Sequence, residues 1–333
     1  MNLETVTAVY SGSVRIGYGV IILVLAFVSS FLQTCCLVCA EKKDLRVRMR
    51  KIAALVVYAL SSAAFALFFG RLIHWYSHYE SYGSFSGAFT CVEGSYHEAG
   101  IIAGFILAGF IACGISGRDV AGRFMGACAS GQMLFMTLVS LVPLFNASDR
   151  GKAVIENAYY QHLPYSCITY LSDGSSQYRP AVFFWKFMVL GILTVISMIL
   201  YFKGKSALET YVCYFAAMAL LDSARYDASF LRSNGFVSLM QIVSGVFLIT
   251  VLIVCAVRSA RARGFHIYHV LFMLAFLLGV SLTGYMEYYV QRHGDLYIYC
   301  YAVMAAACVI MILSVTAMHG RCTRKILKRE EDL

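Results

Sequence analysis

Blocks of about twenty apolar residues, separated by short polar loops, recur along the whole sequence. A transmembrane helix needs about 20 such residues to cross the hydrocarbon core of a bilayer. Apolar residues make up 60% of the chain and charged residues 14%, whereas soluble domains carry about 25% charged residues. No polar stretch is long enough to form a soluble domain. We therefore predict an all-α polytopic membrane protein.

The apolar blocks predict nine spans, and the charges between them predict an orientation. Basic residues cluster in every second loop, beginning with the loop between the first two spans. Because lysine and arginine mark cytoplasmic loops, the N-terminus is expected outside and the C-terminus in the cytoplasm. The net charge of +9 thus indicates topology rather than nucleic-acid binding. The expected spans are at about 16–39, 52–75, 98–116, 124–145, 180–202, 207–222, 236–257, 266–290 and 297–318.

The start of the chain and the cysteines do not indicate a specific catalytic or binding site. Met1 to Arg15 has no basic region before the first apolar block, so we expect no cleaved signal peptide. Most of the twelve cysteines lie in apolar blocks, where a free thiol behaves as a small hydrophobic group. Cys36 and Cys39 have the spacing of a zinc or redox pair, but no partner pair completes a site, so no metal is expected. Cys91 and Cys167 lie in the two long loops that are expected on the outer side. They could form a disulfide in an oxidising compartment or stay free thiols.

Charged residues near the membrane are the candidates for function, because a charge at the bilayer centre costs roughly 2.5–3.5 kcal/mol on insertion scales. Arg225, Ser229 and Arg232 would share one face of a helix. Two guanidinium groups on one face suit a phosphate. The alternative is an outer loop whose arginines contact lipid headgroups.

Three further residues stand at or within the apolar blocks. Arg71 closes the second span and either faces a site or extends outward to the interface. His97 opens the third span, as a general base or as a polar helix end. Lys186 is an isolated charge in an apolar run, and we expect it to be paired or near the interface.

Several short motifs follow one another in an order that resembles a known family. They are Tyr18-Gly19-Val20, Phe69-Gly70-Arg71-Leu72, His97-Glu98-Ala99-Gly100, Tyr178-Arg179-Pro180, and the segment from Ala224-Arg225-Tyr226 through Phe230-Leu231-Arg232 and Asn234-Gly235 to Ser238–Ser244. In this order, from about residue 16 to 257, the chain resembles the prolipoprotein diacylglyceryl transferases of bacterial inner membranes. That family has seven spans, so the last two helices look like an addition.

The resemblance implies an organisation and an activity. It implies a transferase-like core at 1–257, an additional transmembrane hairpin at 258–318 and a cytoplasmic tail at 319–333. The family moves a diacylglyceryl group from phosphatidylglycerol to the lipobox cysteine of a lipoprotein precursor, without a cofactor, in the bacterial cytoplasmic membrane. The partners would be phosphatidylglycerol or another anionic phospholipid and the precursor. The implied catalytic residues are His97, Arg225 and Arg232, and the implied substrate contacts are Tyr18, Arg71, Gly100, Gly235, Ser238 and Gln241.

The chain also departs from the family's pattern. Thr137 and Ser140 stand where the family has its catalytic arginine and an asparagine, and Ser229 stands where it has a glutamate. Val182-Phe183-Phe184-Trp185 replaces Gln-Leu-Tyr-Glu, and Ala99 replaces a glycine. Loss of one preorganised donor typically costs about a hundredfold or more in rate.

Two hypotheses therefore stay open. The first is a divergent transferase in which Arg71, Lys152 or Arg179 replaces the lost arginine. The second is an inactive relative that binds phospholipid or lipoprotein precursor. A transporter or receptor would need a polar path through several spans. The predicted spans contain few polar residues that could form one, beyond Lys186 and Asp222.

Overall fold

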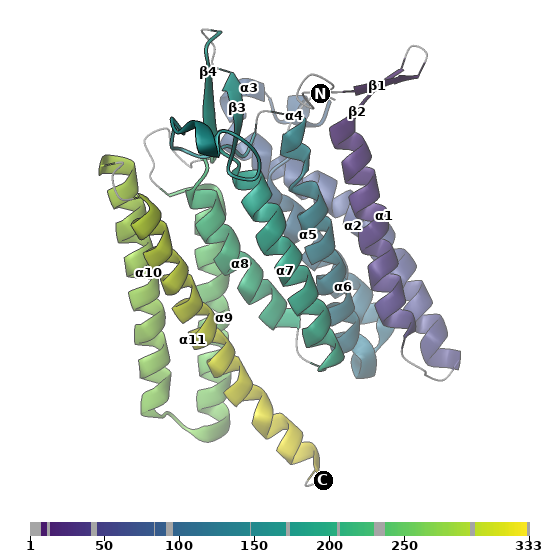
Figure 1. The fold of residues 1–333 in the computed structure, drawn as a ribbon. Helices are drawn as coiled ribbons and strands as arrows, with labels where there is room; N and C mark the ends of the chain where they lie inside the picture. Colours follow the sequence, from purple (N-terminus) through teal and green to yellow (C-terminus); the bar gives the residue numbers. More distant parts are fainter. Residues whose placement is uncertain are drawn as a thin grey trace. The chain divides into compact units, whose positions relative to one another are not determined.

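The protein is an all-α polytopic membrane protein (Figure 1). The computed structural model describes residues 8–11, 14–40, 45–82, 84–90, 96–146, 148–170, 174–204, 207–229, 237–293 and 297–331. Within these ranges, eight helices are long and apolar enough to cross a membrane. The chain divides into two compact units, Met1–Thr210 and Tyr211–Leu333.

Unit 1 contains five long helices that pack side by side (Figure 1). Helix α2 packs against α5, and α6 packs against α1, α5 and α7. Exposed apolar side chains, such as Leu32 on α1 and Ile192 on α7, cover the outside of these helices, as expected for surfaces that contact lipid tails. The five helices are α1 (Tyr18–Cys39), α2 (Leu45–Ser77), α5 (Glu98–Ser116), α6 (Arg118–Val139) and α7 (Val182–Phe202).

Small residues and buried hydrogen bonds hold these helices together. A Cβ on Gly104 of α5 would lie 2.5 Å from the carbonyl carbon of Phe65 on α2, so glycine permits the close approach of the two backbones. The side-chain amide of Gln132 donates to the hydroxyl of Tyr58 at 3.0 Å. Such interhelical hydrogen bonds satisfy polar groups that lipid would leave without a partner.

Short elements gather at one end of unit 1, where α1, α5 and α7 begin and α2 and α6 end (Figure 1). The sequence predicted two long polar loops here, 76–97 and 146–179. The second loop contains an antiparallel hairpin, in which Ser166 pairs with Pro180 and Tyr170 with Ser176. The elements are β1 (Ala8–Ser11), β2 (Val14–Gly17), α3 (Tyr79–Tyr82), α4 (Phe85–Thr90), η2 (Val142–Leu144), η3 (Ala158–Tyr160), β3 (Ser166–Tyr170) and β4 (Ser176–Pro180).

Unit 2 contains α9 (Leu239–Arg263), α10 (Ile267–His293) and α11 (Tyr297–Glu331), with α11 packed against both α9 and α10. Helix α8 (Ala207–Ser223) begins at the end of unit 1 and continues into unit 2. The sequence predicted α8 as a ninth span, but its 17 residues are at the short limit of what crosses a bilayer. The boundary expected at residue 257, between the transferase-like core and the additional hairpin, comes from the resemblance alone and stays a prediction.

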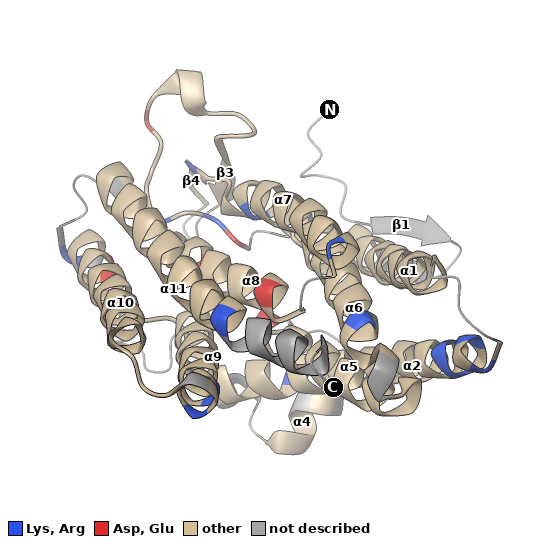
Figure 2. Ribbon diagram, turned by 90° about the horizontal axis from the view of Figure 1, so that it is seen from below, with Lys and Arg blue, Asp and Glu red and all other residues tan. Residues whose placement is uncertain are grey.

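Figure 2 marks basic residues on α2 and α9. Arg46, Arg48 and Arg50 are exposed in the first turns of α2, and Arg258 and Arg261 are exposed in the last turns of α9. This distribution is typical of a multi-pass membrane protein.

Candidate functional site

Two of the sequence motifs meet at one end of unit 1, the last turns of α2 and the start of α5. The backbone N–H of His97 donates to the carbonyl oxygen of Gly70 at 2.9 Å. A Cβ on Gly100 would lie 2.1 Å from the carbonyl oxygen of Phe69 and 2.7 Å from the Cα of Gly70. Only a glycine at position 100 therefore permits this contact, which explains one predicted site residue as a packing requirement.

His97 is the N-cap residue of α5, as one of the two sequence interpretations expected. Its Nδ1 atom accepts a hydrogen bond from the backbone N–H of Ala99 at 3.2 Å. A neutral imidazole whose Nδ1 accepts carries its proton on Nε2. The cap therefore fixes both the position of the ring and its tautomer.

Arg71 is buried beside aromatic rings, with 4% of its surface exposed. Of the two interpretations from the sequence, this burial favours a side chain that faces the interior of the unit. Its guanidinium carbon lies 5.1 Å from the ring centroid of Tyr82 and 5.7 Å from that of Tyr96, which are cation–π distances. Tyr82 is itself held by a 2.8 Å hydrogen bond between its hydroxyl and Nδ1 of His74. The arginine that the resemblance assigns to substrate binding thus lies next to the His97 junction, since Tyr96 precedes His97.

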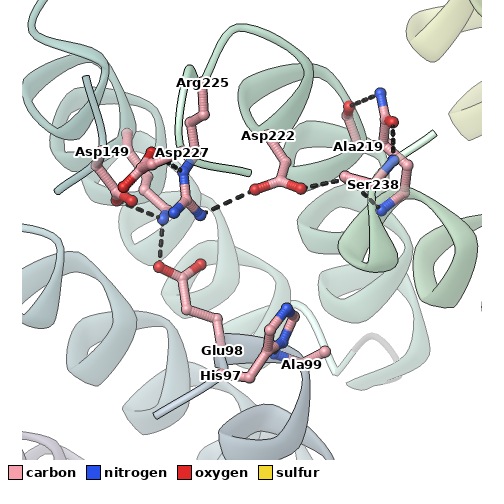
Figure 3. A network of polar contacts seen from close by, with 11 residues as sticks. His97, Glu98, Ala99, Asp149, Ala219, Asp222, Arg225, Asp227 and Ser238 are labelled. Carbon is pink, nitrogen blue, oxygen red and sulfur yellow. Dashed lines mark hydrogen bonds and ion pairs between the residues drawn. The ribbon is translucent and has the colours of Figure 1, made fainter. Parts of the chain in front are cut away.

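A buried lysine joins three elements of the same end of unit 1. Nζ of Lys186, on α7, contacts the carboxylate of Glu98 at the start of α5 and lies 2.9 Å from Oδ2 of Asp149. Figure 3 shows Glu98 extending toward Asp149. Lys186 is paired, as expected, because a buried charge needs a partner and further hydrogen bonds. One ammonium and two carboxylates leave this trio with a negative charge when all three are ionised.

Two arginines of the second polar loop have structural contacts. Nη1 of Arg179 donates to the carbonyl oxygens of Gly151 and Lys152, at 3.3 and 3.2 Å, and so ties this loop to β4. The guanidinium of Arg150 lies 5.0 Å from the ring centroid of Phe183 and contacts Sγ of Cys167. Cys167 is a free thiol, and its possible disulfide partner Cys91 lies outside the described residues.

Thr137 and Ser140, which the resemblance aligned with a catalytic arginine and an asparagine, form hydrogen bonds within the unit. Oγ1 of Thr137 donates to the carbonyl oxygen of Met133 at 2.7 Å and lies 3.0 Å from Oγ1 of Thr194. Ser140 donates to the carbonyl oxygen of Thr137 at 2.6 Å. Both hydroxyl side chains are buried. Tyr18 stacks on Phe145, just beyond the end of α6, with ring centroids 5.1 Å apart.

In unit 2, Arg225 binds two carboxylates. Its Nη1 lies 2.9 Å from Oδ1 of Asp222, and its Nε lies 3.2 Å from Oδ1 of Asp227 (Figure 3). The sequence predicted Arg225 and Ser229 on one helical face. That prediction is wrong, because α8 ends at Ser223 and Arg225 folds back onto the last turn. The two other predicted residues of this segment, Arg232 and Gly235, lie outside the described residues.

Ser238 and Gln241 form a capping box at the start of α9. The Ser238 N–H donates to the side-chain oxygen of Gln241 at 2.8 Å, and the Gln241 N–H donates to Ser238 Oγ at 3.2 Å. Ser238 Oγ also donates to the carboxylate of Asp222, and the Gln241 amide lies 3.4 Å from Oε2 of Glu287 on α10. These two predicted substrate contacts therefore organise the ends of α8, α9 and α10.

No protein-family model, curated protein or solved structure matches the chain. A functional assignment therefore depends on the residues themselves. Within the described ranges, no three His, Cys, Asp or Glu side chains group closely enough to hold a metal ion.

Sequence reasoning missed the partners of the buried cations. Lys186 stood out as a charge in an apolar run, but Glu98 and Asp149 are 88 and 37 positions away in sequence. Asp222 and Asp227 are closer to Arg225, at three and two positions. The sequence did contain a signal for these two partners, because acidic and basic residues alternate between positions 222 and 227. The prediction of a helical face for Arg225 did not take that alternation into account.

Proposed function

We propose that this protein is a divergent phosphatidylglycerol–prolipoprotein diacylglyceryl transferase. The observation that carries the proposal is the junction of α2 and α5. Two motifs that the resemblance singled out, Phe69–Arg71 and His97–Gly100, are joined there by a backbone hydrogen bond and by a contact that only glycine permits. A buried arginine and a histidine lie at this junction, at the end of a membrane-spanning unit.

The reaction is an alkyl transfer to sulfur. The thiolate of the lipobox cysteine attacks the glycerol carbon that carries the phosphate, a sulfur–carbon bond forms, and the carbon–oxygen bond to phosphate breaks. Glycerol phosphate leaves with the bonding electron pair, and the thiol proton passes to a base. The reaction therefore needs a proton acceptor for the thiol and a cation for the departing phosphate.

Arg71 is the strongest candidate for the cation. Arginine offers a planar fork of donors and stays charged, and burial in a low-dielectric site strengthens its attraction for phosphate. The resemblance assigns the phosphate to Arg225 and Arg232. In unit 2, Arg225 is bound to Asp222 and Asp227.

The proposed location is the bacterial cytoplasmic membrane, with the N-terminus outside and the C-terminus in the cytoplasm. The basic ends of α2 and α9 support this orientation by the positive-inside rule. The end of unit 1 that carries His97 and Arg71 then faces outward, together with the β3–β4 hairpin. A lipoprotein precursor that emerges on the outer face would meet that end.

A second candidate is an inactive relative that binds anionic phospholipid or a lipoprotein precursor. One observation favours it. The position of the family's catalytic arginine holds Thr137, whose hydroxyl is committed to Met133 and Thr194. This position supplies no charge to a transition state.

An assay of the purified full-length protein separates the two candidates. The protein would be placed in phosphatidylglycerol vesicles with a lipobox peptide, and the thioether product and released glycerol phosphate would be measured. We expect equal amounts of both products from the unaltered protein, and loss of both in Arg71→Met. Arg258→Ala, which removes an exposed arginine of α9, is the matched control and should keep the activity.

Each other outcome has a defined meaning. A protein that binds the peptide or the lipid but forms no thioether supports the second candidate. A protein that neither reacts nor binds contradicts both.

A further inference from the structure

Arg321, on α11 in unit 2, lies against two aromatic rings of α10. Its guanidinium carbon is 4.2 Å from the ring centroid of Tyr268 and 5.2 Å from that of Phe272, which are cation–π distances. The Arg321 side chain is partly buried, and it has no hydrogen bond or ion pair with any residue in the described ranges. The rings therefore hold the guanidinium, while its N–H donors lack an acceptor in those ranges.

Three helices of unit 2 meet around this arginine. Oγ of Ser259, near the end of α9, lies 3.5 Å from the hydroxyl oxygen of Tyr268. Sγ of Cys255, one turn earlier on α9, lies 3.8 Å from Nδ1 of His319, which is two positions before Arg321 on α11. The end of α9, the start of α10 and the segment of α11 around Arg321 are therefore neighbours.

The segments that meet here carry positive charge without carboxylates. The last turn of α9 adds the exposed side chain of Arg261. The sequence has no aspartate or glutamate from 242 to 286 or from 297 to 329, the two ranges that contain all three segments. Basic residues without acidic neighbours attract anions, and the planar fork of an arginine matches a phosphate. We therefore expect a phosphate group as the partner of Arg321.

The turn between α9 and α10 exposes two large apolar side chains beside these basic residues. Phe265 is 73% exposed and Ile267 is 75% exposed, and Ile267 begins a helix that is apolar enough to cross a membrane. Apolar side chains next to basic ones are typical of the boundary between acyl chains and headgroups. A soluble phosphate would leave both apolar side chains in water, whereas a phospholipid accounts for them and for the arginine.

We propose that this end of unit 2 binds an anionic phospholipid of the cytoplasmic leaflet, with Arg321 on its phosphate. The positive-inside rule predicts that this end faces the cytoplasm. Tyr268 and Phe272 position the guanidinium, and Phe265 and Ile267 contact the acyl chains. None of these residues takes part in the proposed transfer reaction, so the two proposals stand or fall separately.

A local probe in the full-length protein tests this site. The chain has two tryptophans, Trp75 and Trp185; both would be changed to phenylalanine, and Phe265→Trp would place a reporter in the turn. In phosphatidylcholine vesicles, quenching by brominated phosphatidylglycerol or brominated phosphatidylcholine gives the relative affinity of the two lipids at the reporter. We expect a preference of at least about fivefold for phosphatidylglycerol, and Arg321→Met should lower it about fivefold, the factor for one basic residue near an anionic surface.

Two further comparisons make the result specific. Arg292→Met, the same change at an exposed arginine near the other end of α10, is the matched control and should keep the preference. Tyr268→Phe, which keeps the ring, should also keep it, whereas Tyr268→Leu should lower it.

Three outcomes would overturn the proposal. The first is equal quenching by the two lipids, or a preference that Arg321→Met leaves unchanged. The second is loss of the preference when inorganic phosphate is added at constant ionic strength, which would indicate a site for soluble phosphate. The third is the absence of quenching by either lipid, which would show that the turn does not contact the bilayer.

Discussion

The N–H of His97 and the carbonyl oxygen of Gly70 form a 2.9 Å hydrogen bond. The bond connects the start of α5 to α2 at about two turns before α2 ends at Ser77. It places the cap of α5 beside the last turns of α2, and through Tyr96 it places an aromatic ring near the guanidinium of Arg71. The proposed chemistry depends on this junction, so the first prediction concerns the glycine that permits it.

Gly100→Ala should destabilise unit 1. The added Cβ would lie 2.1 Å from the Phe69 carbonyl oxygen, and because that atom is backbone, α2 itself must move. Overpacking of this kind typically costs about 1–3 kcal/mol. Gly114→Ala, in the same helix, is the control, since its Cβ would meet nothing within 4 Å and alanine favours a helix. Denaturant unfolding in detergent would measure both, and equal stability of the two variants would contradict the packing argument.

Lys186→Met should destabilise the protein more strongly. The change removes the shared cation and leaves Glu98 and Asp149 beside each other without it. Removal of one partner from a buried ion pair costs about 3–5 kcal/mol. A triple variant with Glu98→Gln and Asp149→Asn added should recover much of the loss. Lys203→Met at the exposed C-cap of the same helix should cost little, and a comparable loss there would argue against the pairing.

The membrane-spanning helices could be predicted from the sequence, because a helix that crosses the hydrocarbon core needs about 20 apolar residues in a row. Eight of the nine expected spans are present among the described helices. Local periodicity says nothing about partners far away in sequence, which is why the contacts of Lys186 with Glu98 and Asp149 could not be predicted. The predicted helical face of Arg225 was wrong because α8 ends at Ser223, and residue spacing alone does not show where a helix ends.

Ser238→Ala should destabilise unit 2, because one hydroxyl has two roles there. It accepts the Gln241 N–H as the N-cap of α9 and donates to Asp222. Loss of an N-cap costs about 0.5–2 kcal/mol, and the second bond adds to this loss. Ser244→Ala in the same helix is the control, since the buried Ser244 hydroxyl has no hydrogen-bond partner among the described residues. Thermal unfolding should show a lower midpoint for the first variant and an unchanged or higher one for the second.

His97→Asn and His97→Ala should differ in activity, although both remove the imidazole. Asparagine is among the best N-cap residues and alanine among the poorest. If His97 acts only by capping α5, the asparagine variant should transfer diacylglyceryl to a lipobox peptide at a rate close to that of the unaltered protein. The alanine variant should be slower, because the start of α5 loses the bond to Ala99. A loss of equal size in both variants would indicate that the imidazole itself takes part in the reaction, as the proton acceptor for the thiol.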